Sequence, residues 1–309
     1  MKGLELSRSF YREYGQPMLE KEFPDLLPFL AVGFVGSGSD RYGYDDEVSE
    51  DHDFEAGFCV FLPDESVIDR RKAFLLERAY AKLPKEYCGV SRSLLSPVGG
   101  NRNGVFRTAD FYNTAVGSPD GVLTVEQWLH LPDFALAEAI NGEVFYDAFG
   151  EFSAIRKTLL HMPRKVQLKR LAGNLLLMAQ AGQYNFLRCL KHGEPQAAQL
   201  AANEFVTAAL KVVFLLNDRY LPYYKWSFRA LRELDGTENL YPLFSALLMG
   251  NNTEQKYREI EQIAEKVIAL LRQEGYSDAE SGDLERHAYA VNSKIEDATV
   301  RNMHILTAV

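Results

Sequence analysis

Apolar and polar residues along the first third of the chain are spaced in the order helix, strand, strand, helix. The apolar spacing predicts a helix over 4–22, which ends before Pro24. The nearly all-apolar run 29–35 predicts a strand buried on both faces. A second strand is expected over 54–62 and a helix over 67–83. These four elements indicate an α/β unit.

Turn-forming residues separate this unit from the rest of the chain. The stretch 89–104 is rich in Ser, Gly, Asn and Pro, which predicts a loop or hairpin before a third strand over 105–108. The segment 117–121 is the expected linker, because Thr124 and Gln127 form a capping box that starts a helix. We therefore predict two domains, at residues 1–122 and 123–309.

Helical spacing dominates the second predicted domain. Its expected helices cover 124–130, 133–140, 151–161, 164–189, 195–220, 242–249, 253–274 and 283–305. The longer ones are long enough to form a bundle. The expected fold class is therefore α+β, with an α/β domain that has a short mixed sheet, followed by an all-α helical bundle.

Composition limits the classes of function. The chain has 309 residues, of which 47% are apolar and 25% charged, as in ordinary globular proteins. A net charge of −9 repels phosphate backbones and anionic lipid, so neither nucleic acid nor a membrane is expected as a partner. We find no CxxC pair, no signal peptide and no uninterrupted apolar span. We expect a cytoplasmic protein that acts on a small molecule.

The expected chemistry lies between the first two strands. A buried strand that ends at Gly36-Ser37 would expose backbone N–H groups, and a following helix would direct its positive end there, which suits a triphosphate. Asp51 and Asp53 are separated by one residue, so the two-residue period of a strand directs both carboxylates to one face. Their oxygens select Mg²⁺, which gathers phosphates. Gly-Ser alone is more often a flexible loop, and Asp-x-Asp a solvated turn, but their order favours a nucleotide site.

This segment resembles the signature of the polymerase-β-like nucleotidyltransferase superfamily, in which a hydrophobic strand, Gly-Ser, a further glycine (here Gly43) and Asp-x-Asp follow in order. The chain is also similar to an uncharacterised bacterial family of that superfamily, through Phe10-Tyr11, the run 36–53 and the later run 219–226. That family pairs a catalytic domain with a helical domain like those of aminoglycoside adenylyltransferases. The resemblance implies transfer of NMP, expected to be AMP, from ATP or another nucleoside triphosphate to a hydroxyl.

The resemblance also implies roles for individual residues. Asp51 and Asp53 would bind Mg²⁺, and Gly36, Ser37 and Ser39 would contact the nucleotide. Lys225, in the aromatic turn before Trp226, is expected to contact phosphates, with a cation–π or packing role as the alternative.

One departure from the superfamily pattern concerns the third carboxylate. The strand expected over 105–108 carries none, and the nearest acid is Asp110. Asp110 would act as metal ligand or general base, or else cap a local turn, in which case Glu204 of the second domain is the expected base. Glu204 and Lys211 lie on one stripe of the helix over 195–220, where a solvated charged face is the favoured interpretation for Lys211.

Three functions follow from these observations. The first is a magnesium-dependent nucleotidyltransferase with a small-molecule or protein acceptor, for which the acidic chain favours a cationic molecule such as an amino sugar. The second is a nucleotide-binding regulatory protein that transfers nothing because its third carboxylate is absent. The third is an antitoxin-like transferase that modifies a protein partner.

Overall fold

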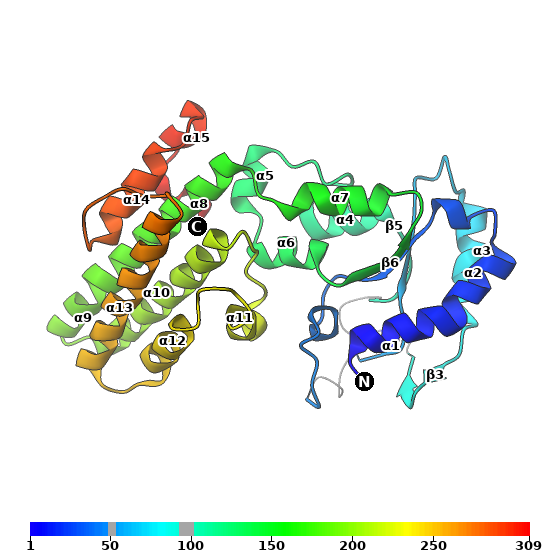
Figure 1. The fold of residues 1–309 in the computed structure, drawn as a ribbon, viewed down its shortest axis with the longest axis horizontal. Helices are drawn as coiled ribbons and strands as arrows, with labels where there is room; N and C mark the ends of the chain where they lie inside the picture. The colour runs from blue at the N-terminus through cyan, green and yellow to red at the C-terminus, as the bar shows by residue number, and fades with distance from the viewer. Residues whose placement is uncertain (49–53, 93–101) are drawn as a thin grey trace. The chain divides into compact units, whose positions relative to one another are not determined.

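The computed structural model describes residues 1–48, 54–92 and 102–309 (Figure 1). The protein is mixed α+β, with a small sheet and many helices. The chain forms two compact units, of which the first comprises Met1–Leu123 with Ala135–His161 and the second Thr124–Phe134 with Met162–Val309. The predicted boundary after residue 122 lies beside the first division. The structure differs from the predicted division at Ala135–His161, where the chain returns to the first unit.

The first unit contains a four-stranded mixed sheet in the order β5-β2-β1-β6. Its strands are β1 (Ala31–Phe34), β2 (Cys59–Leu62), β5 (Gly104–Arg107) and β6 (Glu143–Asp147). Strand β1 is antiparallel to β2 and β6, whereas β2 and β5 are parallel. The first three strands were predicted, although β1 and β2 are shorter than expected. Strand β6 was not predicted, because its five residues do not alternate between apolar and polar types. Only their pairing with β1 identifies them as a strand.

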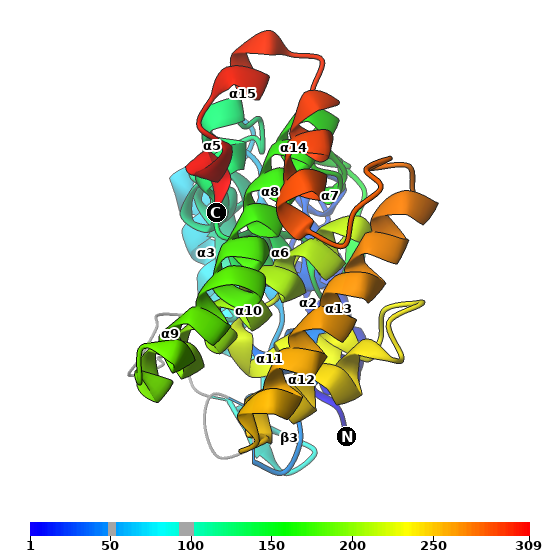
Figure 2. The same ribbon diagram turned by 90° about the vertical axis from the view of Figure 1, so that its left-hand side faces the viewer.

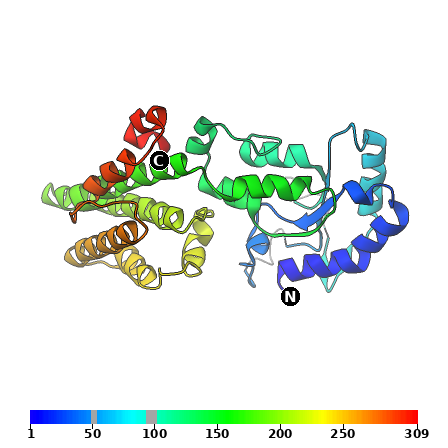
Figure 3. The ribbon, with the colours of Figure 1, turned by 45° about the horizontal axis from the view of Figure 1, so that its top comes forward.

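Helices cover both faces of this sheet (Figures 1 and 3). In β2, Val60 and Leu62 belong to a core with the N-terminal helix and α3, while the ring of Phe61 stacks on Phe152 of α7, with 4.1 Å between the centroids. This alternation is the two-residue period of a strand that is buried on both sides. The helices of this unit include α1 (Gly3–Phe10), α2 (Gln16–Glu22), α3 (Arg70–Ala81), α4 (Thr108–Val116) and α7 (Glu151–Leu160).

The predicted N-terminal helix is confirmed, with one π-helical turn, η1 (Tyr11–Gly15), between α1 and α2. A Cβ atom at Gly15 would lie 2.4 Å from the ring of Phe58. Only glycine at this position therefore lets the N-terminal helix pack this closely against Phe58.

The second unit is helical. Its elements are α5 (Val125–His130), α8 (Arg164–Met178), η5 (Ala179–Phe186), α9 (Leu187–Lys191), α10 (Pro195–Leu216), α11 (Tyr224–Leu231), α12 (Leu240–Met249), α13 (Thr253–Gln273), α14 (Leu284–Ser293), α15 (Ala298–Asn302) and η6 (Ile305–Ala308). Helix α8 packs against α10 and α14, and α13 packs against α10 and α12 (Figure 2). Helix α6 (Asp133–Ile140) begins in this unit and continues into the first.

Two predictions at the ends of helices have opposite outcomes. The capping box of α5 is confirmed, because the Thr124 hydroxyl accepts from the Gln127 N–H and the Gln127 side chain accepts from the Thr124 N–H. The single helix expected over 283–305 is wrong. The chain breaks after Ser293, and Asp297 caps the separate helix α15.

Helix α10 has the length and apolar content of a membrane span, and 61% of its most apolar window is buried inside the protein. It is the only such helix within 1–48, 54–92 and 102–309. The core helix of a helical unit has the same length and apolar content, so these two properties do not distinguish a membrane span from a core helix.

Candidate functional site

Strand β1 leads into a turn in which two glycines adopt positive φ angles. Gly36 has φ 100° and Gly38 φ 126°, a conformation that side chains disfavour. Asn141 fixes this turn, because its Oδ1 accepts from the Gly36 N–H at 2.8 Å and its Nδ2 donates to the Gly36 carbonyl at 2.7 Å. The sequence predicted an exposed Gly36 N–H, but in the structure this group is already bonded to Asn141. Ser37, by contrast, is exposed.

Arginine side chains hold the other half of the turn. Arg102 donates to the Ser37 carbonyl at 2.8 Å and to Asp40 Oδ1 at 2.7 Å. A Cβ atom at Gly38 would lie 1.7 Å from Arg102 Nη2, so glycine is required for this contact. The fully buried Arg41 donates to Asp40 and stacks on Phe34, 3.8 Å from the ring centroid. These contacts give the turn one fixed conformation.

The helix expected after Gly36-Ser37 is a single 3₁₀ turn, η3 (Ser39–Tyr42), which ends at Gly43 with φ 70°. Ser39 is half-buried at its start. This turn is too short to supply the dipole of a longer helix. Arg102 and the buried Arg41 share the single carboxylate of Asp40, which leaves one positive charge beside this turn instead.

Glu138 is an acid beside this turn that sequence analysis did not identify. It lies on α6 three residues before Asn141, which directly follows the last residue of that helix. In the part of the chain that the structure describes, its half-buried carboxylate makes no hydrogen bond or ion pair. Burial raises the pKa of Glu138 against the opposing effect of Arg102, and Glu138 in turn raises the pKa of Tyr42, which burial raises most. A carboxylate in such surroundings can accept a proton.

The sequence-predicted site residues occupy different places. Asp51 and Asp53 lie outside the described residues. Asp110 is exposed in the first turn of α4, and its carboxylate caps no turn there. Glu204 is exposed on α10 in the second unit. Lys225 is also exposed, and its Nζ lies 5.2 Å from the centroid of the Trp226 ring, which is the cation–π contact given as the alternative.

No group of three or more His, Cys, Asp and Glu side chains able to hold a metal ion occurs within the described ranges. Asn141, Arg102 and Glu138 could not be found from the sequence, since each lies more than 60 residues from Gly36 and belongs to no motif. Their positions follow from the pairing of β6 and β5 into the same sheet as β1.

The second unit buries its own charged cluster. Arg170 Nη2 lies 3.1 Å from Asp133 Oδ1, and both side chains are at most 7% exposed. Burial raises the pKa of Asp133, while Arg170 and Lys211 lower it. Lys211 is half-buried and its pKa is lowered by burial, so the solvated interpretation is wrong for Lys211, although Glu204 on the same stripe is exposed.

A comparison with protein families matches residues 128–227 to a family described as a domain of unknown function (DUF4037). The match covers less than half of the chain and includes Asp133, Glu138 and Asn141. No curated protein and no solved structure matches the chain.

Proposed function

We propose that this protein is a magnesium-dependent nucleotidyltransferase that moves NMP from ATP or another nucleoside triphosphate to a hydroxyl. The observation that carries the proposal is the turn at Gly36-Ser37, where positive-φ glycines follow a buried strand and are held by Asn141 and Arg102. A turn with so little side chain and an arginine beside it suits a phosphate group. The resemblance of the segment 36–53 to the superfamily signature supports the same function.

Asp51 and Asp53 are the proposed magnesium ligands. Their carboxylate oxygens are the hard donors that Mg²⁺ prefers, and the bound metal would neutralise charge on the phosphates. Arg102 adds a fixed positive charge at the turn.

Glu138 is the proposed general base, in place of Asp110 or Glu204. Its carboxylate would take the proton of the acceptor hydroxyl as the acceptor oxygen forms a bond to the α-phosphorus. The bond from that phosphorus to the bridging oxygen would break, and pyrophosphate would leave with the electron pair. The acceptor is expected to be a small molecule or a protein.

Calorimetric titration of the full chain with ATP and the other three nucleoside triphosphates, with and without Mg²⁺, tests the nucleotide site. Binding should require Mg²⁺ and disappear in Asp51→Ala/Asp53→Ala. Asn141→Ala should weaken it about tenfold or more, because the freed turn must be ordered again, whereas the exposed Asn113→Ala is the matched control. No binding of any triphosphate by the wild type would overturn the proposal.

Transfer is measured separately, as pyrophosphate release in a screen of hydroxyl acceptors that includes amino sugars. Glu138→Gln should keep nucleotide affinity but slow transfer by about 10²–10⁴-fold. Nucleotide binding without release for any acceptor would favour the regulatory protein instead. Modification of a partner protein would favour the antitoxin-like transferase.

A further inference from the structure

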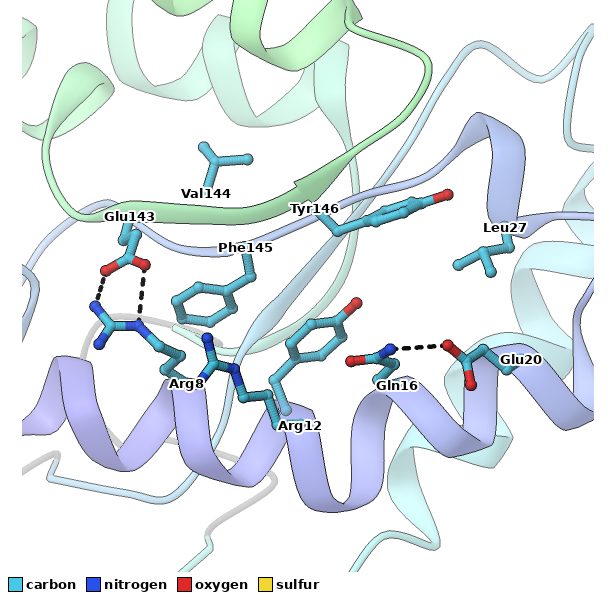
Figure 4. Close-up of a pocket in the computed structure, with 10 residues that line it drawn as sticks. Arg8, Arg12, Gln16, Glu20, Leu27, Glu143, Val144, Phe145 and Tyr146 are labelled. Atoms are coloured by element: carbon cyan, nitrogen blue, oxygen red, sulfur yellow. Dashed lines mark hydrogen bonds and ion pairs between the residues drawn. The ribbon is translucent and has the colours of Figure 1, made fainter.

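A pocket in the first unit lies away from the residues of the Gly36 turn, between the N-terminal helix and strand β6 (Figure 4). It has a volume of about 340 Å³, within the range of small-molecule sites. Glu143 and Phe145 point from the strand toward the helix, and Arg8, Arg12 and Gln16 point from the helix toward the strand (Figure 4).

Both walls of the pocket depart from regular geometry at the same place. The helix has its π-turn at Tyr11–Gly15, and β6 has a bulge. Tyr146 pairs with Val32 and Val144 pairs with Gly33, so Phe145 between them has no partner in β1. The Phe145 ring stacks on Tyr11, with 5.7 Å between centroids and 18° between planes. Such bulges and π-turns re-aim side chains and are frequent at functional sites.

One end of the pocket carries excess positive charge. The Arg8 guanidinium makes two hydrogen bonds to Glu143, which neutralises it. Arg12 is exposed and makes no hydrogen bond or ion pair with any residue that the structure describes. The pair and the unpaired arginine leave one positive charge at this end, while Glu20, which accepts a hydrogen bond from Gln16, carries a negative charge elsewhere in the lining. An anionic group on a ligand is therefore favoured beside Arg12 and away from Glu20.

The aromatic wall carries a polar group without a partner. Tyr11 is only 5% exposed and lines the pocket, yet its hydroxyl has no hydrogen-bond partner among the described residues. Burial, together with Tyr146 and Glu20, raises the pKa of Tyr11 to about 12, so the hydroxyl keeps its proton and can donate it in a hydrogen bond. The hydroxyl is not among the fully enclosed polar atoms, so it faces the pocket, where water or a ligand can accept its hydrogen bond.

We propose that this pocket binds a small planar molecule that carries a carboxylate or phosphate group. Arg12 binds the anionic group, the Tyr11 and Phe145 rings contact the planar part, and the Tyr11 hydroxyl donates a hydrogen bond to it. The site is independent of the proposed nucleotide site, since it uses neither the Gly36 turn nor Asp51 and Asp53.

Calorimetry of the full chain in metal-free buffer with EDTA tests this site, with phenyl phosphate and benzoate as probes. Inorganic phosphate and benzyl alcohol are the comparison ligands. Inorganic phosphate retains only the anionic group, and benzyl alcohol retains only the ring. We expect at least one probe to bind, and to bind more tightly than both comparison ligands. Arg12→Gln should weaken that binding about tenfold or more, and Tyr11→Phe, which keeps the ring stack, about fivefold.

Two controls separate this site from general charge and from the nucleotide site. Arg71→Gln, an exposed arginine on α3, should leave probe affinity unchanged. Asp51→Ala/Asp53→Ala should also leave it unchanged, even if that variant has lost ATP. The proposal is overturned if neither probe binds the wild type, if Arg12→Gln binds as tightly as wild type, if inorganic phosphate binds as well as the probes, or if Asp51→Ala/Asp53→Ala abolishes binding.

Discussion

Each unit buries an arginine–aspartate pair, and the surroundings of the two pairs differ. In the first unit Asp40 receives hydrogen bonds from both Arg41 and Arg102, and Arg41 also donates to the Asn103 side chain at 2.9 Å. In the second unit Arg170 contacts Asp133 at 3.1 Å, while its Nε and Nη1 have no partner among the described residues. The first pair belongs to a hydrogen-bonded network, whereas the second has Lys211 near it but makes few hydrogen bonds.

The difference shows what a buried ion pair contributes. Removing charges from water costs several kcal/mol, and only additional hydrogen bonds offset that cost. The network around Asp40 also fixes the glycine turn, so it supports the proposed site. The pair at Arg170 has few such bonds, and an apolar pair of similar size could replace it.

The largest effect is expected for Asp40→Ala. It leaves Arg41 fully buried and Arg102 mostly buried without their carboxylate, so we expect a loss of about 3–5 kcal/mol in the free energy of unfolding. Urea unfolding followed by circular dichroism measures this loss. The exposed Asp25→Ala is the control, and a loss below about 1 kcal/mol for Asp40→Ala would contradict the role of the network.

A smaller effect is expected in the second unit. Arg170→Met should cost about 3 kcal/mol, because Asp133 keeps its burial and loses its closest cation. The double variant Arg170→Met/Asp133→Leu should return to within about 1 kcal/mol of wild type or exceed it. Tryptophan fluorescence reports this unit specifically, since Trp128 and Trp226 both lie in it. A double variant no more stable than the single one would show that the pair is needed.

The smallest effect concerns pH. Burial raises the pKa of Asp133 in the folded state, so the unfolded chain loses this proton first and stability falls as the pH rises above about 4. The stability of Asp133→Asn relative to wild type should therefore rise with pH over that range. Asp297 behaves oppositely, because the hydrogen bond from Lys165 lowers its pKa and its contribution is lost as the pH falls below about 4.

Unfolding midpoints of the two variants between pH 3 and 7 check these signs. The cost of Asp297→Asn should shrink toward pH 3, while the stability of Asp133→Asn relative to wild type should fall over the same range. Parallel pH profiles for the two variants would contradict the assigned surroundings of both carboxylates.

Local patterns predicted the regular elements well. The α5 capping box and the N-terminal helix follow from near neighbours in the chain, which helical spacing brings together. The predicted strands ran longer than β1 and β2, because apolar composition continues past the residues that pair. Strand β6 and the break before α15 depend on pairing and capping that periodicity does not show.

The proposed site likewise combines residues that the sequence indicated with residues that it did not. Gly36, Gly38 and Gly43 were visible in the sequence, and all three have positive φ in the structure. Asn141, Arg102 and Glu138 gave no signal, since a lone Asn, Arg or Glu is ordinary in any soluble chain. The solvated face assigned to Lys211 was wrong because Asp133 and Arg170, distant in sequence, lie beside it in the second unit.

The sequence by itself determined the α+β class, the helical second half and the glycine-rich turn, because helical periodicity and glycine conformation are properties of neighbouring residues. Only the tertiary structure decided which side chains surround that turn and which charges are buried. Those contacts join residues tens of positions apart, and their energies depend on burial and on every group packed around them.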